Sequence, residues 1–183
     1  VIESLFRQSC LPDKIILYLS QDQFPAEEKL PKTLLEQRLR GLEIVFSKGD
    51  MRSHKKYLTA FREYPNDIII TVDDDIFYRS DFIAGLLNWH SRFPHAIITN
   101  WTKKIIFDYK GCASYAAAPD ASQKDIGKEN SHNIVIGVAG NLYPPKAVYK
   151  DCLEWDLIKR LAFTTDDIWL SAMAILAGTS FVY

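Results

Sequence analysis

The sequence predicts a single α/β domain, with a mostly parallel sheet and helices on both of its faces. Short apolar runs alternate with amphipathic segments at helical spacing through residues 1–100, which is the pattern of strands joined by crossover helices. The chain has 183 residues, of which 48% are hydrophobic and 25% charged. This length suits one core of ordinary size but is short for two, so we expect residues 1–183 to form one domain.

The expected strands of the first half are short apolar runs that lie between turn residues or polar segments. They cover residues 14–19, 42–46, 68–72 and 96–99. Helix boundaries follow from residues that favour helix starts and stops, namely Pro, Ser or Asp at the start and Gly or Pro at the end. The expected helices cover an opening segment at residues 1–6 and segments from Pro31 to Gly41, from Ser53 to Pro65, and from Ser80 or Asp81 to Pro94.

The second half is less regular. Residues 103–133 are polar and too long for a simple connection, so we expect a mobile loop near the site. Apolar residues 134–138 follow, then a helix at 146–153, a last helix from Asp166 to Gly178 and a strand at the end. Because the sequence opens within a helix and stops within a strand, we expect a fragment that is truncated at its N-terminus.

Charge and cysteine content limit the classes of binding partner and the cellular compartment that we expect. The 22 basic and 23 acidic residues are spread along the chain, so no overall field favours nucleic acid or an anionic membrane. Cys10, Cys112 and Cys152 are odd in number and lack zinc-site spacing, which indicates reduced thiols. The apolar runs are shorter than the ~20 residues of a spanning helix, and no signal peptide is visible. We therefore expect a cytoplasmic protein without a transmembrane segment.

An acidic motif, Asp73-Asp74-Asp75, follows the strand at residues 68–72. Open parallel sheets bind ligands beyond the carboxyl ends of their strands. Adjacent carboxylates repel one another unless a cation compensates, and oxygen ligands favour Mg²⁺ or Mn²⁺ bound together with phosphates. In an extended turn, Asp73 and Asp75 point to one side and Asp74 to the other, toward a sugar or ribose. The alternative is a solvated turn that caps the following helix.

A second acidic pair, Asp166 and Asp167, opens the last helix. Capping is one explanation, with Thr164 or Thr165 as the N-cap and the carboxylates near the positive end of the helix dipole. The other is that one of the two carboxylates reaches the site as a general base for a hydroxyl group.

Three segments together resemble bacterial glycosyltransferases of the A-type fold, related to family 2. They are residues 69–78, residues 137–145 and residues 165–169, and residues 4–17 also resemble the first helix and second strand of these enzymes. The resemblance implies that Asp73 and Asp75, as a D-x-D motif, bind Mn²⁺ or Mg²⁺ on the donor diphosphate. It also implies that Asp167, with Asp166 next, is the base of an inverting reaction.

The resemblance divides the domain into a nucleotide-sugar-binding half, residues 1–100, and an acceptor-side half, residues 101–183. It implies that Gly137, Gly140 and Asn141 form the floor of the acceptor pocket, where glycine lets the backbone approach a sugar closely. Two features depart from the family: its first strand is absent, and the acidic pair is Asp-Asp where the wider family often has Glu-Asp.

Further candidates flank these motifs. Arg52, Lys55 and Lys56 open a helix at the expected active edge and are candidates for contact with the nucleotide or its phosphates. A solvated helix face is the alternative for each lysine, and it is the expectation for His54. Trp101 and Trp169 are candidates for stacking on an acceptor sugar, with core packing as the alternative for Trp169.

The predicted function is a metal-dependent, hexosyltransferase-like glycosyltransferase. The resemblance favours a UDP-sugar as nucleotide-sugar donor and a glycan or lipid-linked glycan as acceptor. It suggests bacterial surface polysaccharide synthesis, with the protein associated peripherally with the inner face of the membrane. One rival is a non-catalytic sugar-nucleotide or glycan-binding module. The other is a phosphohydrolase with Asp73 as nucleophile, which is disfavoured because Phe77 occupies the position where Thr is expected.

Overall fold

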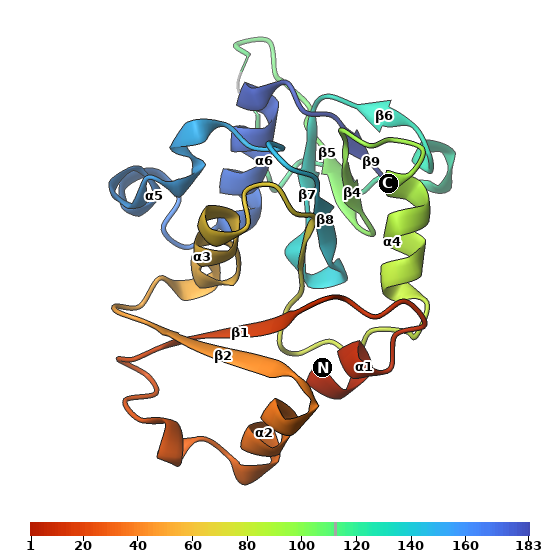
Figure 1. Cartoon of the computed structure of the whole chain (residues 1–183). Coiled ribbons are helices and arrows are strands. Elements are labelled where there is room, and N and C mark those ends of the chain that lie inside the picture. Colours follow the sequence, from red (N-terminus) through yellow and green to blue (C-terminus); the bar gives the residue numbers. More distant parts are fainter. Residues whose placement is uncertain (112) are drawn as a thin grey trace.

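The computed structural model describes residues 1–111 and 113–183 and distributes its strands over three sheets (Figure 1). A parallel pair is formed by β1 (Ile15–Ser20) and β2 (Leu42–Ser47). An antiparallel pair is formed by β5 (Thr102–Lys104) and β7 (Asn133–Val135). The five-stranded sheet has the order β3 (Ile69–Thr71), β8 (Asn141–Tyr143), β4 (Ile97–Thr99), β9 (Phe181–Val182) and β6 (Glu129–Asn130).

The α/β class is confirmed, but the prediction of a mostly parallel sheet is wrong. In the five-stranded sheet β8 runs antiparallel to both β3 and β4, and β6 runs antiparallel to β9. Among the described strands of this sheet, β4 and β9 are therefore the only neighbours that pair in parallel. The strands that reverse the direction lie within residues 102–143, part of which we expected to be a loop. Each has only two or three residues, which is too short for a strand to show its alternating pattern.

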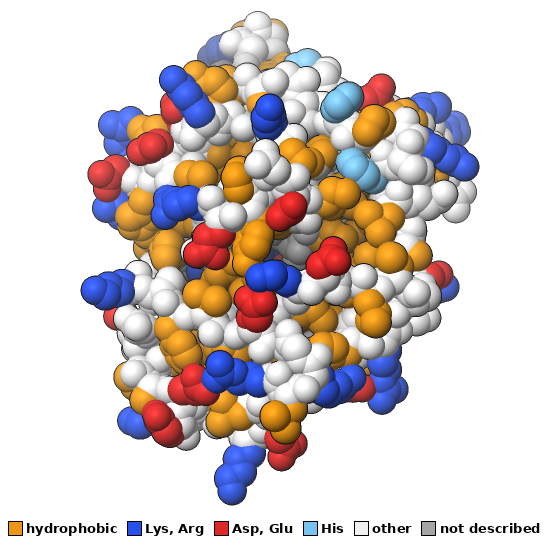
Figure 2. All heavy atoms as spheres, viewed as in Figure 1, with side chains coloured by type: hydrophobic (Ala, Val, Ile, Leu, Met, Phe, Trp, Pro, Cys, Tyr) orange, Lys and Arg blue, Asp and Glu red, His pale blue; other side chains and the backbone are white. Residues whose placement is uncertain are grey.

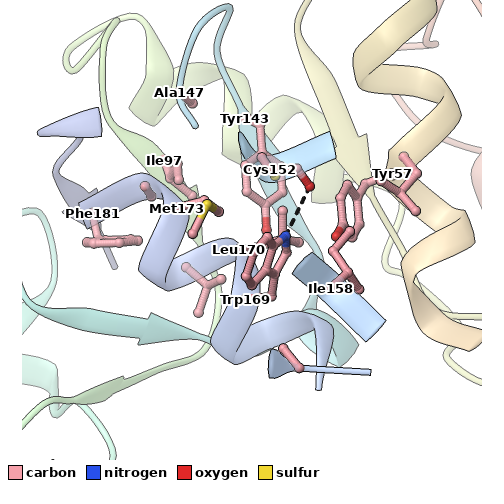
Figure 3. Packing of buried hydrophobic residues seen from close by; sticks show 14 residues of the cluster. Tyr57, Ile97, Tyr143, Ala147, Cys152, Ile158, Trp169, Leu170, Met173 and Phe181 are labelled. Carbon is pink, nitrogen blue, oxygen red and sulfur yellow. Dashed lines mark hydrogen bonds between the residues drawn. The ribbon is translucent and has the colours of Figure 1, made fainter. Parts of the chain in front are cut away.

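Helices cover both faces of this sheet, as predicted. On one face lies α4 (Phe82–His90), and on the other lie α3 (Lys55–Glu63) and α6 (Asp166–Ala177). Neighbouring residues of a strand point to opposite faces, so β4, β8 and β9 each contribute to both cores. The core under α4 contains Ile98, Leu142 and Val182, whereas the core under α3 and α6, drawn in Figure 3, contains Ile97, Tyr143 and Phe181.

Several predicted helix boundaries hold and others do not. Gly41 (φ 103°) and Gly178 (φ 76°) end helical segments in the left-handed conformation, as expected. The segment after Pro31 divides into α2 (Lys32–Glu36) and a 3₁₀ turn, and α1 (Ile2–Phe6) opens the chain. The helix expected at 146–153 is wrong: Lys146 has a left-handed φ of 64°, a 3₁₀ turn forms at Lys150–Leu153, and α5 (Trp155–Leu161) follows.

The surface in Figure 2 carries side chains of both charges, interspersed over the face shown. This distribution matches the near-neutral composition of the chain. Among the described residues, no helix combines the length and the apolar character needed to cross a membrane. Cys10 and Cys152 are free thiols, whereas Cys112 lies outside the described residues.

Candidate functional site

The acidic residues meet at one part of a groove of about 700 Å³. Its apolar walls come mainly from α1, β1 and α2, which lie close together in Figure 1, and residues 70–74 of β3 and the turn after it complete the lining. Within the described part of the chain, β1 pairs only with β2 and β3 only with β8, so each has one edge without a strand partner. The acidic side chains that line the groove are Asp73, Asp74, Asp166 and Asp167.

A second hollow, of about 470 Å³, lies between α3 and the α5 region. The only carboxylate in its lining is Asp50, which forms an ion pair with Lys55 at 3.5 Å. The larger groove, where four carboxylates gather, is therefore the candidate site.

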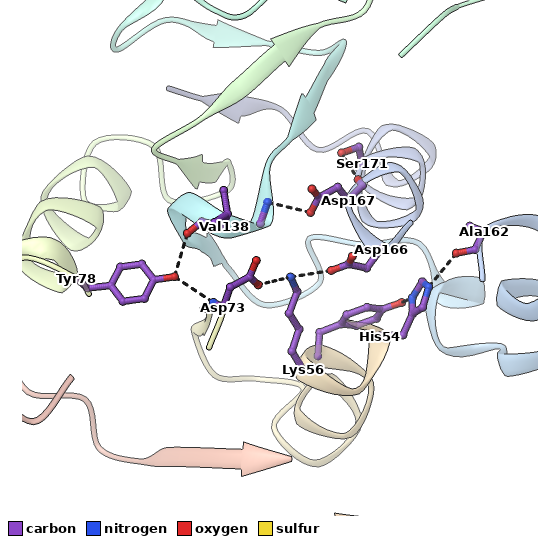
Figure 4. Close-up of polar contacts among 11 residues, drawn as sticks. His54, Lys56, Asp73, Tyr78, Val138, Ala162, Asp166, Asp167 and Ser171 are labelled. Carbon is purple, nitrogen blue, oxygen red and sulfur yellow. Dashed lines mark hydrogen bonds and ion pairs between the residues drawn. The ribbon is translucent and has the colours of Figure 1, made fainter. Parts of the chain in front are cut away.

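Lys56 joins the two acidic segments (Figure 4). Its Nζ lies 2.7 Å from Asp73 Oδ1, beyond the end of β3, and 2.8 Å from Asp166 Oδ2, on the first residue of α6. Burial disfavours the charged forms of Lys56 and Asp166, but their attraction outweighs it. The pKa of the Lys56 ammonium is raised and the pKa of the Asp166 carboxyl is lowered. The pair is therefore ionised at neutral pH.

Asp167 is held differently from its neighbour. Its Oδ1 accepts a hydrogen bond of 2.9 Å from the backbone N–H of Gly137. Burial and the adjacent negative charge of Asp166 raise the pKa of the Asp167 carboxyl to about 6, although Lys56 and the Gly137 N–H act in the opposite direction. A base with a pKa near the working pH is suited to proton transfer. Two neighbouring carboxyls with pKa values moved apart are typical of acid–base sites.

The 3₁₀ turn Gly137–Ala139 approaches these side chains closely. A Cβ atom at Gly137 would lie 2.6 Å from Lys56 Nζ and 2.8 Å from Asp167 Oδ1. Both distances are shorter than van der Waals contact, so the lysine and the carboxylate occupy these positions because residue 137 has no side chain.

The acidic turn is anchored through Tyr78. The backbone N–H of Asp73 donates to the Tyr78 hydroxyl at 3.0 Å, and this hydroxyl donates to the Val138 carbonyl at 3.0 Å. Asp74 and Asp75, by contrast, are exposed in the turn. Tyr78 could not be predicted as a site residue, because nothing in the local sequence pattern shows that a residue after the motif turns back to hold it.

The structure brings together five of the predicted site residues: Lys56, Asp73, Gly137, Asp166 and Asp167. Arg52, Lys55 and Asp74 also line the groove. Thr165 occupies the N-cap position of α6, but its side chain makes no capping hydrogen bond. The capping explanation of the acidic pair thus lacks the expected threonine contact.

The predicted acceptor residues are more scattered. Trp169 is buried, with its indole N–H donating to the Cys152 carbonyl at 3.0 Å, so it packs in the core. Asn141 is 1% exposed within β8, and Gly140 lies against Phe82. These three residues do not line the groove. Trp101 is 42% exposed, and its indole N–H donates to Asp120 at 2.8 Å.

The expectation that His54 is solvated is wrong. His54 is fully buried, with Nε2 2.9 Å from the Ala162 carbonyl and Nδ1 2.8 Å from the Tyr57 hydroxyl. A carbonyl only accepts, so Nε2 carries the proton and Nδ1 accepts from Tyr57. Burial lowers the pKa of His54, which is therefore a neutral structural residue beneath the site.

The chemistry of the donors beside Lys56 bears on the expected Mn²⁺ or Mg²⁺. The Lys56 ammonium shows that the position beside Asp73 favours a cation. The second oxygen of Asp73 and the exposed carboxylate of Asp75 are oxygen donors, the type that both ions prefer. Asp73 and Asp75 are the residues that would hold such an ion.

No protein-family model matches this chain, and a comparison with curated proteins found no match either. The likeness to glycosyltransferases therefore rests on the motifs in the sequence.

Proposed function

We propose that this domain is a metal-dependent glycosyltransferase that moves a sugar from a nucleotide-diphosphate donor to a hydroxyl acceptor. The observation that carries the proposal is Asp167. It is a half-buried carboxylate with a pKa raised to about 6, and it lies beside a second acidic segment at a groove large enough for a nucleotide.

In this reaction the acceptor hydroxyl attacks the anomeric carbon of the donor sugar, and the bond from that carbon to the diphosphate breaks. Asp167 is mostly ionised at pH 7 and takes the hydroxyl proton as the new bond forms. A divalent ion bound at Asp73 and Asp75 would supply Lewis-acid stabilisation of the charge on the leaving diphosphate.

The remaining residues orient these groups. The Gly137 N–H holds the Asp167 carboxylate at 2.9 Å, and Lys56 keeps Asp166 ionised beside it. Arg52 and Lys55 line the groove as cations suited to contact with phosphates, and the apolar wall along β1 suits the nucleoside. The resemblance favours a UDP-sugar as donor. It also favours a glycan or lipid-linked acceptor in surface polysaccharide synthesis, in the cytoplasm at the inner face of the membrane.

Calorimetric titration tests the donor site. Nucleoside diphosphates and nucleotide sugars are titrated into the wild type and Asp75→Ala, each with and without Mn²⁺. We expect binding that depends on Mn²⁺ in the wild type and loses this dependence in the variant. If no nucleotide binds under any of these conditions, the proposal is wrong.

The second candidate is a sugar-nucleotide-binding module without turnover. The unpaired edges of β1 and β3 favour it, since they leave the groove wider than a continuous sheet would. This module would bind the same nucleotides with the same dependence on metal. It would release no nucleoside diphosphate from a bound nucleotide sugar, and this separates the two functions.

A further inference from the structure

The Lys56 ammonium already occupies a cation position in the site. It lies 2.7 Å from one carboxylate and 2.8 Å from another, and the two come from separate elements of the fold (Figure 4). Its side chain is 18% exposed, although lysine is normally a surface residue. A charged group this buried stays in place because both of its partners carry the opposite charge.

The surroundings leave little room for a second cation beside it. Gly137 closes over the ammonium so tightly that a Cβ atom there would lie 2.6 Å from Nζ. Asp73 Oδ1 already contacts Nζ, so a metal ion bound by the second oxygen of the same carboxylate would lie close to the ammonium. Two cations that share one carboxylate repel each other strongly when they are shielded from water.

The Lys56 side chain can adopt a second position, directed into the groove. Lys56 is itself part of the groove lining, beside Lys55 and Ser53. Its long stem can rotate so that the ammonium points into the groove and leaves Asp73 free.

We propose that Lys56 and a divalent ion compete for Asp73, so that the ion binds fully only when the ammonium has turned away. This inference rests on the proposed function, which is the source of the expected ion. The resting site is then held together by Lys56. A donor diphosphate, which adds oxygen ligands for the metal and a second anionic partner for the ammonium, favours the exchange.

Mn²⁺ titrated alone into the protein, followed by calorimetry, tests the competition. Lys56→Met should bind Mn²⁺ about tenfold or more tightly than the wild type, because a nearby repelling charge is gone. Lys55→Met is the matched control, since it loses the same charge one residue away but pairs with Asp50 instead. The control should change the Mn²⁺ affinity by less than about twofold, as expected of a screened surface charge.

Adding Asp73→Asn to Lys56→Met should abolish the gain in affinity. Equal Mn²⁺ affinity in Lys56→Met and the wild type would overturn the proposal, and so would an equal gain in Lys55→Met. Circular dichroism establishes that each variant is folded.

A second measurement does not depend on the fold of the variants. The wild type, labelled with ¹⁵N in its lysine side chains, is titrated with diamagnetic Mg²⁺ and followed by nuclear magnetic resonance. The Lys56 Nζ signal should move with the Mg²⁺ concentration while the Lys55 signal stays nearly constant. Binding of Mg²⁺ that leaves the Lys56 signal unchanged would contradict the competition.

Neither readout requires sugar transfer. Competition for Asp73 without any turnover would refute the proposed function and keep this inference. Metal-dependent turnover without competition would support the proposed function and refute this inference.

Discussion

The two acidic segments of the site contain the same residue type in different surroundings. In the turn after β3, Asp74 and Asp75 are exposed and only Asp73 has a cationic partner, Lys56. At the start of α6, Asp166 is 7% exposed and Asp167 accepts a hydrogen bond from Gly137. Burial and partners, rather than residue type, thus distinguish the two segments.

At the start of α6 the charges must be compensated for the fold to be stable, whereas the exposed carboxylates of the turn after β3 are free to bind a ligand. A buried carboxylate costs free energy unless its charge is compensated, as Asp166 is by Lys56. Asp167 is compensated only in part, which raises its pKa to about 6. The exposed carboxylates of the turn keep their hydration and remain available to a metal ion. We therefore expect large effects on turnover or stability from changes around the first turn of α6, and small effects on stability from changes to the exposed carboxylates of the turn after β3.

The largest expected effect follows from Asp167→Asn. The amide can still accept the hydrogen bond from Gly137 but cannot take a proton, so turnover should fall by roughly 10²–10⁴-fold, the usual contribution of a general base. Donor affinity should change little, since the substitution is nearly isosteric. Steady-state kinetics together with calorimetry measure both quantities. Unchanged turnover would remove Asp167 from its proposed role.

Lys56→Met should come next, as a loss of stability. The substitution leaves Asp73 and the buried Asp166 without their cation, and breaking such a pair costs about 3–5 kcal/mol of the free energy of unfolding. Urea denaturation measures this change. Lys55→Met is the control and should cost less than about 1 kcal/mol, because its contact with Asp50 is longer and more exposed. Similar losses in both variants would mean that Lys56 is not a structural cation.

A smaller effect of opposite sign is expected for the stability of Asp167→Asn. Because the folded pKa of Asp167 is raised to about 6, the folded state binds its proton more tightly than the unfolded state does. The contribution of Asp167 to the free energy of unfolding therefore falls as pH rises from the unfolded pKa of about 4 to the folded value, and stays low above it.

Asp167→Asn should consequently stabilise the protein at pH 7 by about 1–3 kcal/mol, and this gain should shrink toward zero near pH 4. Urea denaturation of both proteins at the two pH values measures it. A variant that is less stable than the wild type at pH 7 would mean that the folded state does not disfavour the ionised form of Asp167.

The smallest effect on stability is expected for Asp75→Ala. Its side chain is exposed in the turn, so the free energy of unfolding should stay within about 0.5 kcal/mol of the wild type. Thermal or urea denaturation, carried out without metal, checks this. A loss as large as that of Lys56→Met would show that the turn is structural, and the contrast between the two acidic segments would fail.

Part of this structure could be predicted from the sequence. The strands β1, β2 and β4 follow apolar runs, and Gly41 and Gly178 end helical segments where expected. Both acidic segments could be found because each lies at the boundary of an element, β3 or α6.

Other features depend on tertiary contacts that local patterns do not encode. The insertion of β8 between β3 and β4 reverses the sheet, yet β8 is only three residues long. The ion pairs of Lys56 with Asp73 and Asp166 join three separate elements, and the burial of His54 depends on the Ala162 carbonyl far along the chain. His54 and Lys56 both lie at the start of one helix, and their sequence positions alone do not show that one packs in the core and the other lies in the groove.

The most direct test of the central claim is the release of nucleoside diphosphate from bound nucleotide sugars, with water or a supplied glycan as the hydroxyl acceptor. It compares the wild type with Asp167→Asn at equal donor saturation and in the presence of Mn²⁺. We expect release by the wild type and its near loss in the variant, with donor binding retained. Binding without release by the wild type, or equal release by both proteins, would contradict the role of Asp167 as the base of a glycosyltransferase.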